Sequence, residues 1–214
     1  MIYLLSPLKK EGTTSLPMIT FTLVSEVIDF SHCDTLMFTS KQAVVSANNI
    51  DKSWKDYPCV AIGSATKKKV EELGGKVIYA PKEFYAESLA KDIKEHFTDK
   101  KLLYLRPREV SFDSKAYLAK HNIFLEEQII YETSCITYTI REKPVEGAII
   151  IFTSPSTIKC FFENFEWHES YVAVLIGHAT RKHLPNECQF VLADEPLITS
   201  CIKKAEEVER NRKK

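Results

Sequence analysis

Two short motifs that could bind an anion each occur twice in this 214-residue chain. Phe-Thr-Ser stands at residues 38–40 and 152–154, and Ile-Gly-x-Ala-Thr stands at 62–66 and 176–180. Each copy follows an apolar run and precedes a polar, helix-like stretch. The first N–H groups of a helix have no partner within the helix, so they attract carboxylates and phosphates, and a glycine lets the backbone approach such a ligand closely. The motifs therefore predict anion binding that does not need lysine.

The spacing of these motifs indicates an internal repeat. Phe38 and Phe152 are 114 positions apart, and so are Gly63 and Gly177. Within each copy the phenylalanine and the glycine are 25 positions apart, which is about the length of a strand, a helix and the return to the next strand. We therefore expect two similar α/β lobes. Because ligands gather at the carboxyl ends of strands in open α/β sheets, two lobes with facing edges would form one cleft.

A simpler interpretation of each serine and threonine in these motifs is a helix cap, since both residue types favour that position. The occurrence of each motif in two copies shifts the balance towards a binding role. Neither a phosphate-binding P-loop nor a GxGxxG dinucleotide motif occurs in the sequence, so nucleotide cofactors have no support.

Apolar, β-branched runs alternate with helix-like stretches along the chain, as is typical of an α/β protein with a largely parallel sheet. Runs that predict strands are 2–5, 18–24, 35–39, 59–62, 77–79, 102–105, 149–153, 172–176 and 190–192. Stretches that predict helices are 40–49, 65–73, 84–97, 113–121, 155–165, 179–184 and 195–211.

Composition and charge narrow the class of protein. Hydrophobic residues make up 44% of the chain and charged residues 27%, as in ordinary globular proteins. Lys plus Arg and Asp plus Glu both number 29, so the basic surface of a nucleic-acid-binding protein is not expected. No apolar run reaches the roughly 20 residues of a membrane-spanning helix, and we expect a cytoplasmic protein.

The six cysteines show no CxxC pair and no zinc-like spacing. We expect buried or idle thiols and no metal site. They are Cys33, Cys59, Cys135, Cys160, Cys188 and Cys201.

The order of these motifs resembles that of the uroporphyrinogen-III synthase family, whose chains carry an FTSxxAV-type motif and an (I/V)GxxT motif in each of two lobes. Residues 38–44, 62–66, 152–156 and 176–180 carry the match. Leu-Tyr-Leu-Arg-Pro at 103–107 resembles the family's strand into an Arg-containing turn, although Pro107 stands where many relatives have glycine, and 130–133 resembles its VYxT segment. The resemblance covers nearly the whole chain.

The resemblance implies an α/β fold with two lobes of parallel sheet flanked by helices and joined by a two-stranded β connector. One lobe consists of residues 1–20 and 137–214, and the other of 21–136. Segments 18–24 and 128–136 are the expected connector strands. Residues 7–17 are too few for the helix and second strand usual in the family, so we expect the first lobe to be trimmed there.

The resemblance also implies a reaction: closure of hydroxymethylbilane to uroporphyrinogen III, with inversion of ring D, loss of water and no cofactor. Loss of the hydroxyl group calls for a weak acid, and Tyr131 is the candidate, with a packed hinge tyrosine as the alternative. The expected substrate-binding residues are Thr39, Ser40, Gly63, Ser64, Thr66, Arg106, Ser154, Ser156, Gly177, His178 and Thr180.

A second class of function stays open, in which a two-lobed binding or sensory protein closes over an anionic small molecule without chemistry. We expect a monomer whose partner is a small molecule rather than nucleic acid or membrane. A transient contact with hydroxymethylbilane synthase is left open, since no docking motif is recognisable.

Overall fold

The computed structural model describes residues 1–81 and 86–212. These residues form two compact units, with Met1–Thr20 and Ser134–Lys214 in unit 1 and Phe21–Thr133 in unit 2. None of the helices in the described part of the chain combines the length and apolar character needed to cross a membrane.

Unit 1 is built on a parallel sheet with the strand order β11-β10-β9-β1-β2. Its strands are β1 (Ile2–Leu4), β2 (Thr14–Ser15), β9 (Ile149–Phe152), β10 (Val172–Leu175) and β11 (Phe190–Leu192). Its helices are η2 (Ile140–Glu142), α5 (Pro155–Asn164), α6 (His178–Arg181) and α7 (Ile198–Arg212). The central strands read as continuous apolar runs because helices cover both of their faces.

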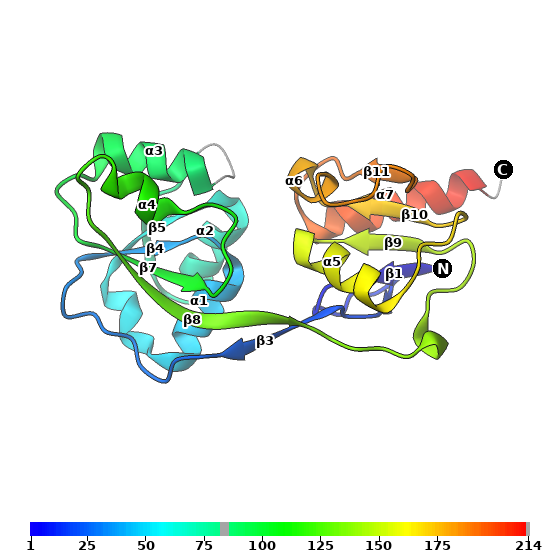
Figure 1. Cartoon of the computed structure of the whole chain (residues 1–214), viewed down its shortest axis with the longest axis horizontal. Helices are drawn as coiled ribbons and strands as arrows, with labels where there is room; N and C mark the ends of the chain where they lie inside the picture. The colour runs from blue at the N-terminus through cyan, green and yellow to red at the C-terminus, as the bar shows by residue number, and fades with distance from the viewer. Residues whose placement is uncertain (82–85, 213–214) are drawn as a thin grey trace. The chain divides into compact units, whose positions relative to one another are not determined.

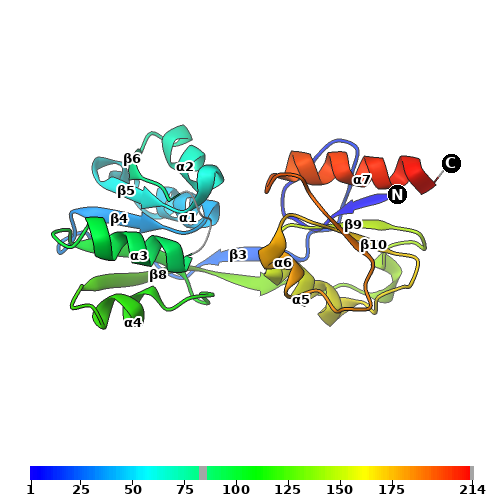
Figure 2. The same cartoon turned by 90° about the horizontal axis from the view of Figure 1, so that it is seen from above.

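Alternate residues of the unit 1 strands pack against different helices. Figure 2 shows α7 on one side of β9 and β10, with α5 and α6 on the other. Ile149 and Ile151 share a buried cluster with Cys201 and Ala205 of α7, whereas Phe152 meets Phe161 of α5 at a ring separation of 5.5 Å. This alternation follows from the two-residue period of a strand.

Unit 2 has a six-stranded sheet with the order β3-β8-β7-β4-β5-β6, shown on the left in Figure 1. Its strands are β3 (Ile19–Leu23), β4 (Thr35–Phe38), β5 (Pro58–Ala61), β6 (Lys76–Tyr79), β7 (Leu102–Pro107) and β8 (Leu125–Cys135). Its helices are α1 (Lys41–Ile50), η1 (Lys52–Asp56), α2 (Gly63–Glu72), α3 (Ala86–His96) and α4 (Ser114–Ala119).

Two hydrophobic clusters lie on opposite faces of the unit 2 sheet. Leu36, Phe38 and Leu103 pack with Val44 of α1, and Tyr131 belongs to this first cluster. The second cluster lies under α3 and α4 and contains Met37, Val60, Tyr104, Leu89 and Leu118. Consecutive residues of β4 therefore point to different helix layers, which places the residues that follow β4 at both faces as well.

The element types expected from the sequence are found, with differences at their ends. The expected helix 113–121 spans only Ser114–Ala119, and the expected helix 179–184 is the single turn His178–Arg181. Residues 84 and 85 of the expected helix 84–97 lie outside the described residues. As expected, β1 is followed by no helix, and only the two-residue β2 extends the sheet there.

The boundary between the units lies within β8, slightly before the expected one. Residues 134–136 belong to unit 1, whereas the sequence placed them with 21–136. The physical reason is that the chain after Thr133 is attached to unit 1: the Ile136 N–H donates to the Met18 carbonyl at 2.9 Å, and Cys135 forms a disulfide with Cys160 of α5. The expectation of idle thiols was therefore wrong for these two cysteines, while the other four are free.

Candidate functional site

The first copy of the Phe-Thr-Ser motif lies where β4 ends and α1 begins. Ser40 has an extended backbone and its Oγ accepts a hydrogen bond from the Ala43 N–H at 3.0 Å, which makes it the N-cap of α1. The helix-cap interpretation of this serine is therefore confirmed. Because Ser40 lies two positions past the buried strand β4, its hydroxyl stands at the carboxyl end of the unit 2 strands.

Ser40 also contacts the candidate acid. The Tyr131 hydroxyl of β8 lies 2.9 Å from Ser40 Oγ, and only 4% of Tyr131 is exposed. The ring packs edge-on against Phe21 of β3, with ring centres 5.9 Å apart. Burial raises the pKa of Tyr131, while the hydrogen bond to Ser40 opposes part of that rise. The phenol thus stays protonated at neutral pH and can donate a hydrogen bond or a proton.

A second tyrosine, Tyr104, occupies the matching place on the opposite face of the sheet. The Tyr104 hydroxyl lies 2.7 Å from Thr39 Oγ1, and burial is the main cause that raises the pKa of Tyr104 to about 12. Thr39 and Ser40 are neighbours in sequence, yet each holds a different tyrosine because strand residues alternate between faces. The sequence interpretation did not include Tyr104, and its one available signal is a phenol within the aliphatic run 102–105.

Arg106 lies at the end of β7 but its charge is already compensated. Its Nε is 3.2 Å from Glu127 Oε2 of β8, with both side chains less than one-fifth exposed. Its Nη1 donates to the carbonyls of Pro107 and Arg108, each at 3.1 Å. A cavity of about 390 Å³ beside Arg106 and Glu127 also includes Lys115. A substrate carboxylate at Arg106 would therefore have to compete with Glu127.

The Ile-Gly-x-Ala-Thr motif of unit 2 opens α2. Gly63 is the first helical residue and has φ +76°, a left-handed conformation that other residues adopt at a cost. The Ile62 N–H donates to the Phe38 carbonyl at 2.9 Å, so this motif lies beside the first one. Ser64 is exposed, whereas Thr66 is only 5% exposed. The side chain available to a ligand at this motif is thus that of Ser64.

Unit 1 repeats the capped strand end. Ser154 caps α5 through the Thr157 N–H at 3.3 Å, and Thr157 Oγ1 accepts from the Ser154 N–H in return. Pro155 occupies the first helical turn, as its fixed φ favours. Ser156 is half-buried in the same turn. Both sequence copies of Phe-Thr-Ser therefore fold into the same local structure.

The second Ile-Gly-x-Ala-Thr copy differs from the first. It leads into the single turn of α6, so the strong helix N-terminus expected at 179–184 is not formed. Gly177 has an extended backbone and no atom within 4 Å of the position its Cβ would occupy. His178 is exposed, and Thr180 is 2% exposed with its N–H donating to the Gly177 carbonyl at 3.1 Å. Open backbone at Gly177, rather than a helix dipole, is what this segment offers a ligand.

The structure thus joins Thr39, Ser40 and Tyr131 at one sheet edge and leaves Arg106 there in an ion pair. The expected site residues of unit 1, among them Ser154 and Gly177, follow the paired strands β9 and β10. Among the described residues, the potential ligand atoms of Cys135, Cys160 and Glu163 lie as close together as a metal site would require. None of these three residues belongs to the expected site.

Comparison with known proteins agrees with this architecture. A family model described as uroporphyrinogen-III synthase HemD matches residues 9–203. The uroporphyrinogen-III synthase of Synechococcus elongatus is 27% identical over 150 residues, a match that covers 64% of this chain and 56% of the relative. The chain thus spans little more than half of that relative's length.

Two solved structures extend the comparison to the fold. Uroporphyrinogen-III synthetase from Helicobacter pylori is 26% identical, with a TM-score of 0.80 over 97% of this chain and 98% of that chain. A mutant uroporphyrinogen III synthase from Thermus thermophilus is 11% identical, with a TM-score of 0.62 over 99% and 98% of the two chains, and it supports the fold alone. The chain belongs to the uroporphyrinogen-III synthase family.

Proposed function

We propose that this chain is a uroporphyrinogen-III synthase, a lyase that closes hydroxymethylbilane to uroporphyrinogen III with inversion of ring D and loss of one water. The observation that carries the proposal is the family match across residues 9–203, supported by the two copies of the capped strand end at Ser40 and Ser154.

The reaction depends more on positioning of the substrate than on a strong nucleophile of the protein. The hydroxyl of the bilane leaves as water when it takes up a proton, and the carbon left behind is a cation stabilised by the pyrrole nitrogen. Ring D attacks this carbon through its substituted position, which gives a spiro intermediate. The bond that joins ring D to the bridging carbon of ring C then breaks and forms again at the unsubstituted carbon of ring D, which inverts the ring, and loss of the proton from that carbon restores the pyrrole. Holding the two carbons together in one conformation supplies a large part of the acceleration by proximity.

Tyr131 is suited to donate the proton to the leaving hydroxyl. Ser40 Oγ accepts from the Ala43 N–H, so its own O–H is free to donate to the Tyr131 oxygen at 2.9 Å. In that orientation the contact with Ser40 does not use the phenol proton, which can then be donated to a ligand. Hydrogen bonds in such a chain polarise one another, and an O–H that accepts a hydrogen bond is a better donor. Ser40 thus acts as a positioning residue for Tyr131.

The acetate and propionate groups of the bilane are proposed to bind at the open strand ends. In unit 2 the exposed Ser64 and the first N–H groups of α2, which no side chain caps, are available, together with those of α1 that Ser40 does not bind. In unit 1 the first turn of α5, with Ser154 and Ser156, and the open backbone at Gly177 offer the same kind of contact. Buried Thr66 and Thr180 contribute through the backbone that they hold in place.

We further propose that the chain works as a cytoplasmic monomer and meets hydroxymethylbilane synthase only transiently, when the bilane is handed over. Size-exclusion chromatography with light scattering tests the first part: a mass of 24.5 kDa supports it and a doubled mass contradicts it.

Turnover separates this enzyme from a binding protein of the same fold. The chain is added to a tenfold excess of freshly generated hydroxymethylbilane, and the remaining bilane is measured against the spontaneous loss in buffer. If the chain is a catalyst, each chain consumes many equivalents of bilane in the time in which few equivalents are lost in buffer alone. Withdrawal of one equivalent, followed by loss at the spontaneous rate, would contradict catalysis and support a tetrapyrrole-binding protein.

A further inference from the structure

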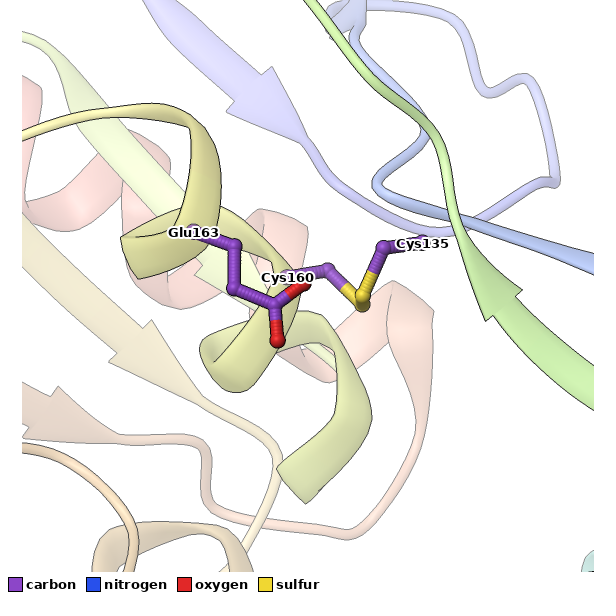
Figure 3. A group of neighbouring side chains, drawn as sticks. All are labelled: Cys135, Cys160 and Glu163. Carbon is purple, nitrogen blue, oxygen red and sulfur yellow. A yellow bond between two sulfur atoms is a disulfide. The ribbon is translucent and has the colours of Figure 1, made fainter.

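Cys135 and Cys160 form a pair that the proposed reaction does not use. Cys135 is the last residue of β8 and is half-buried, while Cys160 lies in α5 and is 2% exposed. Their sulfurs are bonded and their Cα atoms are 5.2 Å apart. Figure 3 shows the bond from the strand to the helix, with the Glu163 carboxylate beside the sulfurs. The ligand atoms of these three residues all lie within 4.8 Å of one another.

The other four thiols are placed where oxidation is disfavoured. Burial raises the pKa of Cys59 to about 12, and it is the main cause that raises the pKa of Cys33, Cys188 and Cys201 to about 11. Since the thiolate is the reactive form, these side chains are poor nucleophiles at neutral pH. None of these four is bonded to another cysteine, so exchange between a dithiol and a disulfide is expected at Cys135 and Cys160.

The chain around this pair is held in place without the sulfur–sulfur bond. Asn164 lies four residues after Cys160, on the same face of α5. Its Nδ2 donates to the Ile136 carbonyl at 2.8 Å, and its Oδ1 accepts from the Tyr138 N–H at 2.6 Å. The Ile136 N–H is held by the Met18 carbonyl. After reduction these contacts keep the two thiols next to each other, so the disulfide can form again without a rearrangement of the backbone.

We propose that Cys135 and Cys160 are a reversible dithiol–disulfide site, which couples the end of β8 to α5 according to the thiol–disulfide balance of the surroundings. The half-buried Cys135 thiolate attacks one sulfur of a low-molecular-weight disulfide, such as oxidised glutathione, and one thiolate leaves. The Cys160 thiolate then attacks Cys135 in this mixed disulfide and releases the second thiol. Two protein thiols are oxidised while one small disulfide is reduced to two thiols.

Glu163 sets the rate of this exchange. A carboxylate oxygen of Glu163 lies within 4.8 Å of both sulfurs, and a negative charge at this distance disfavours the thiolate. The reduced pair is therefore oxidised more slowly than a pair without this neighbour. Glu163→Gln removes the charge and keeps the shape, so it is expected to speed oxidation several-fold.

The test is a redox titration of the folded full-length chain. Wild type is equilibrated in buffers of reduced and oxidised glutathione, quenched with acid, denatured, alkylated and weighed by mass spectrometry. Six alkylated cysteines are expected in reducing buffer and four in oxidising buffer, with the same curve from both directions. Cys135→Ser and Cys160→Ser remove the transition, whereas Cys33→Ser, at a free thiol outside the pair, retains it.

Three results would overturn the proposal. One is a pair that stays oxidised across all glutathione ratios in the folded protein, which would make it a permanent structural bond. Another is a pair that never oxidises in excess oxidised glutathione. The third is a pair that oxidises only after Zn²⁺ is stripped by a chelator, which would make these side chains a metal site. An oxidation rate of Glu163→Gln equal to that of wild type would refute the role of the carboxylate.

Discussion

Replacing Tyr131 with phenylalanine removes a single oxygen atom at the carboxyl edge of the unit 2 sheet. Ser40 Oγ loses its contact at 2.9 Å but keeps the Ala43 N–H, so the change in stability is that of one hydrogen bond, about 1 kcal/mol. If the phenol is the proton donor, turnover falls by ~100- to 10,000-fold, the usual contribution of a positioned acid. Such a loss corresponds to about 3–5 kcal/mol in the barrier. The catalytic effect therefore exceeds the effect on folding by a wide margin.

The assay is the initial rate of bilane consumption at several substrate concentrations, with urea unfolding of the same samples. Tyr171→Phe is the matched control, because Tyr171 is 1% exposed and its hydroxyl donates to the Pro144 carbonyl in unit 1, away from the expected site. Both variants should lose similar stability, and only Tyr131→Phe should lose kcat. A Tyr131→Phe protein with the kcat of wild type would refute the acid role and leave Tyr131 as a packed hinge tyrosine.

Four further substitutions test how the backbone and the disulfide support the site. Gly75→Ala places a methyl group 2.6 Å from Cη2 of the buried Trp54, so thermal unfolding should show a loss of roughly 1–3 kcal/mol, and an unchanged midpoint would refute this packing. Gly63→Ala, at φ +76°, should lower the free energy of unfolding in urea by about 1 kcal/mol or more. Gly177→Ala, whose methyl group meets no other atom, should leave stability intact but weaken turnover, because the methyl group blocks close approach of the substrate. A loss of stability in Gly177→Ala and none in Gly63→Ala would contradict both assignments. Cys135→Ser opens a disulfide across a sequence separation of 25 residues and should remove up to about 3.5 kcal/mol from the oxidised protein, while equal stability of the two proteins under oxidising conditions would count against the bond.

The parts of the site that the sequence predicted are those determined by neighbouring residues. An apolar run followed by Thr-Ser specifies a buried strand, a cap and a helix, and the capping hydrogen bonds of Ser40 and Ser154 are made within three residues along the chain. The internal repeat strengthens this prediction, because the same strand, cap and helix pattern occurs twice in the sequence. Glycine at 63 follows the same logic, since the turn into α2 requires a positive φ.

The parts that it did not predict depend on contacts between distant segments. Tyr104 reaches Thr39 because β7 pairs with β4, and Arg106 is neutralised by Glu127 because β8 pairs with β7. Neither pairing can be deduced from the local pattern. The Cys135–Cys160 bond likewise needs the register of β8 against α5.

Helix α6, which follows the second glycine motif, is shorter than α2, which follows the first. The sequence contains a local indication of this difference, although the apolar periodicity predicted a longer helix at 179–184. In unit 2 the residues after Gly63 are good helix formers up to Glu72, and α2 runs for ten residues. In unit 1 a proline at position 185 follows His178 closely, and residues before a proline are driven away from helical conformation. The helix therefore ends at Arg181, and the second copy presents open backbone instead of a helix N-terminus.

The isomer composition of the product shows directly whether this chain is a uroporphyrinogen-III synthase. Freshly generated hydroxymethylbilane is incubated with catalytic amounts of the chain, the products are oxidised to uroporphyrins, and the type I and type III isomers are separated by chromatography. We expect type III as the main product, in an amount that follows the concentration of active protein and falls to the spontaneous background after heat inactivation. Type I alone, formed at the rate seen in buffer, would contradict it.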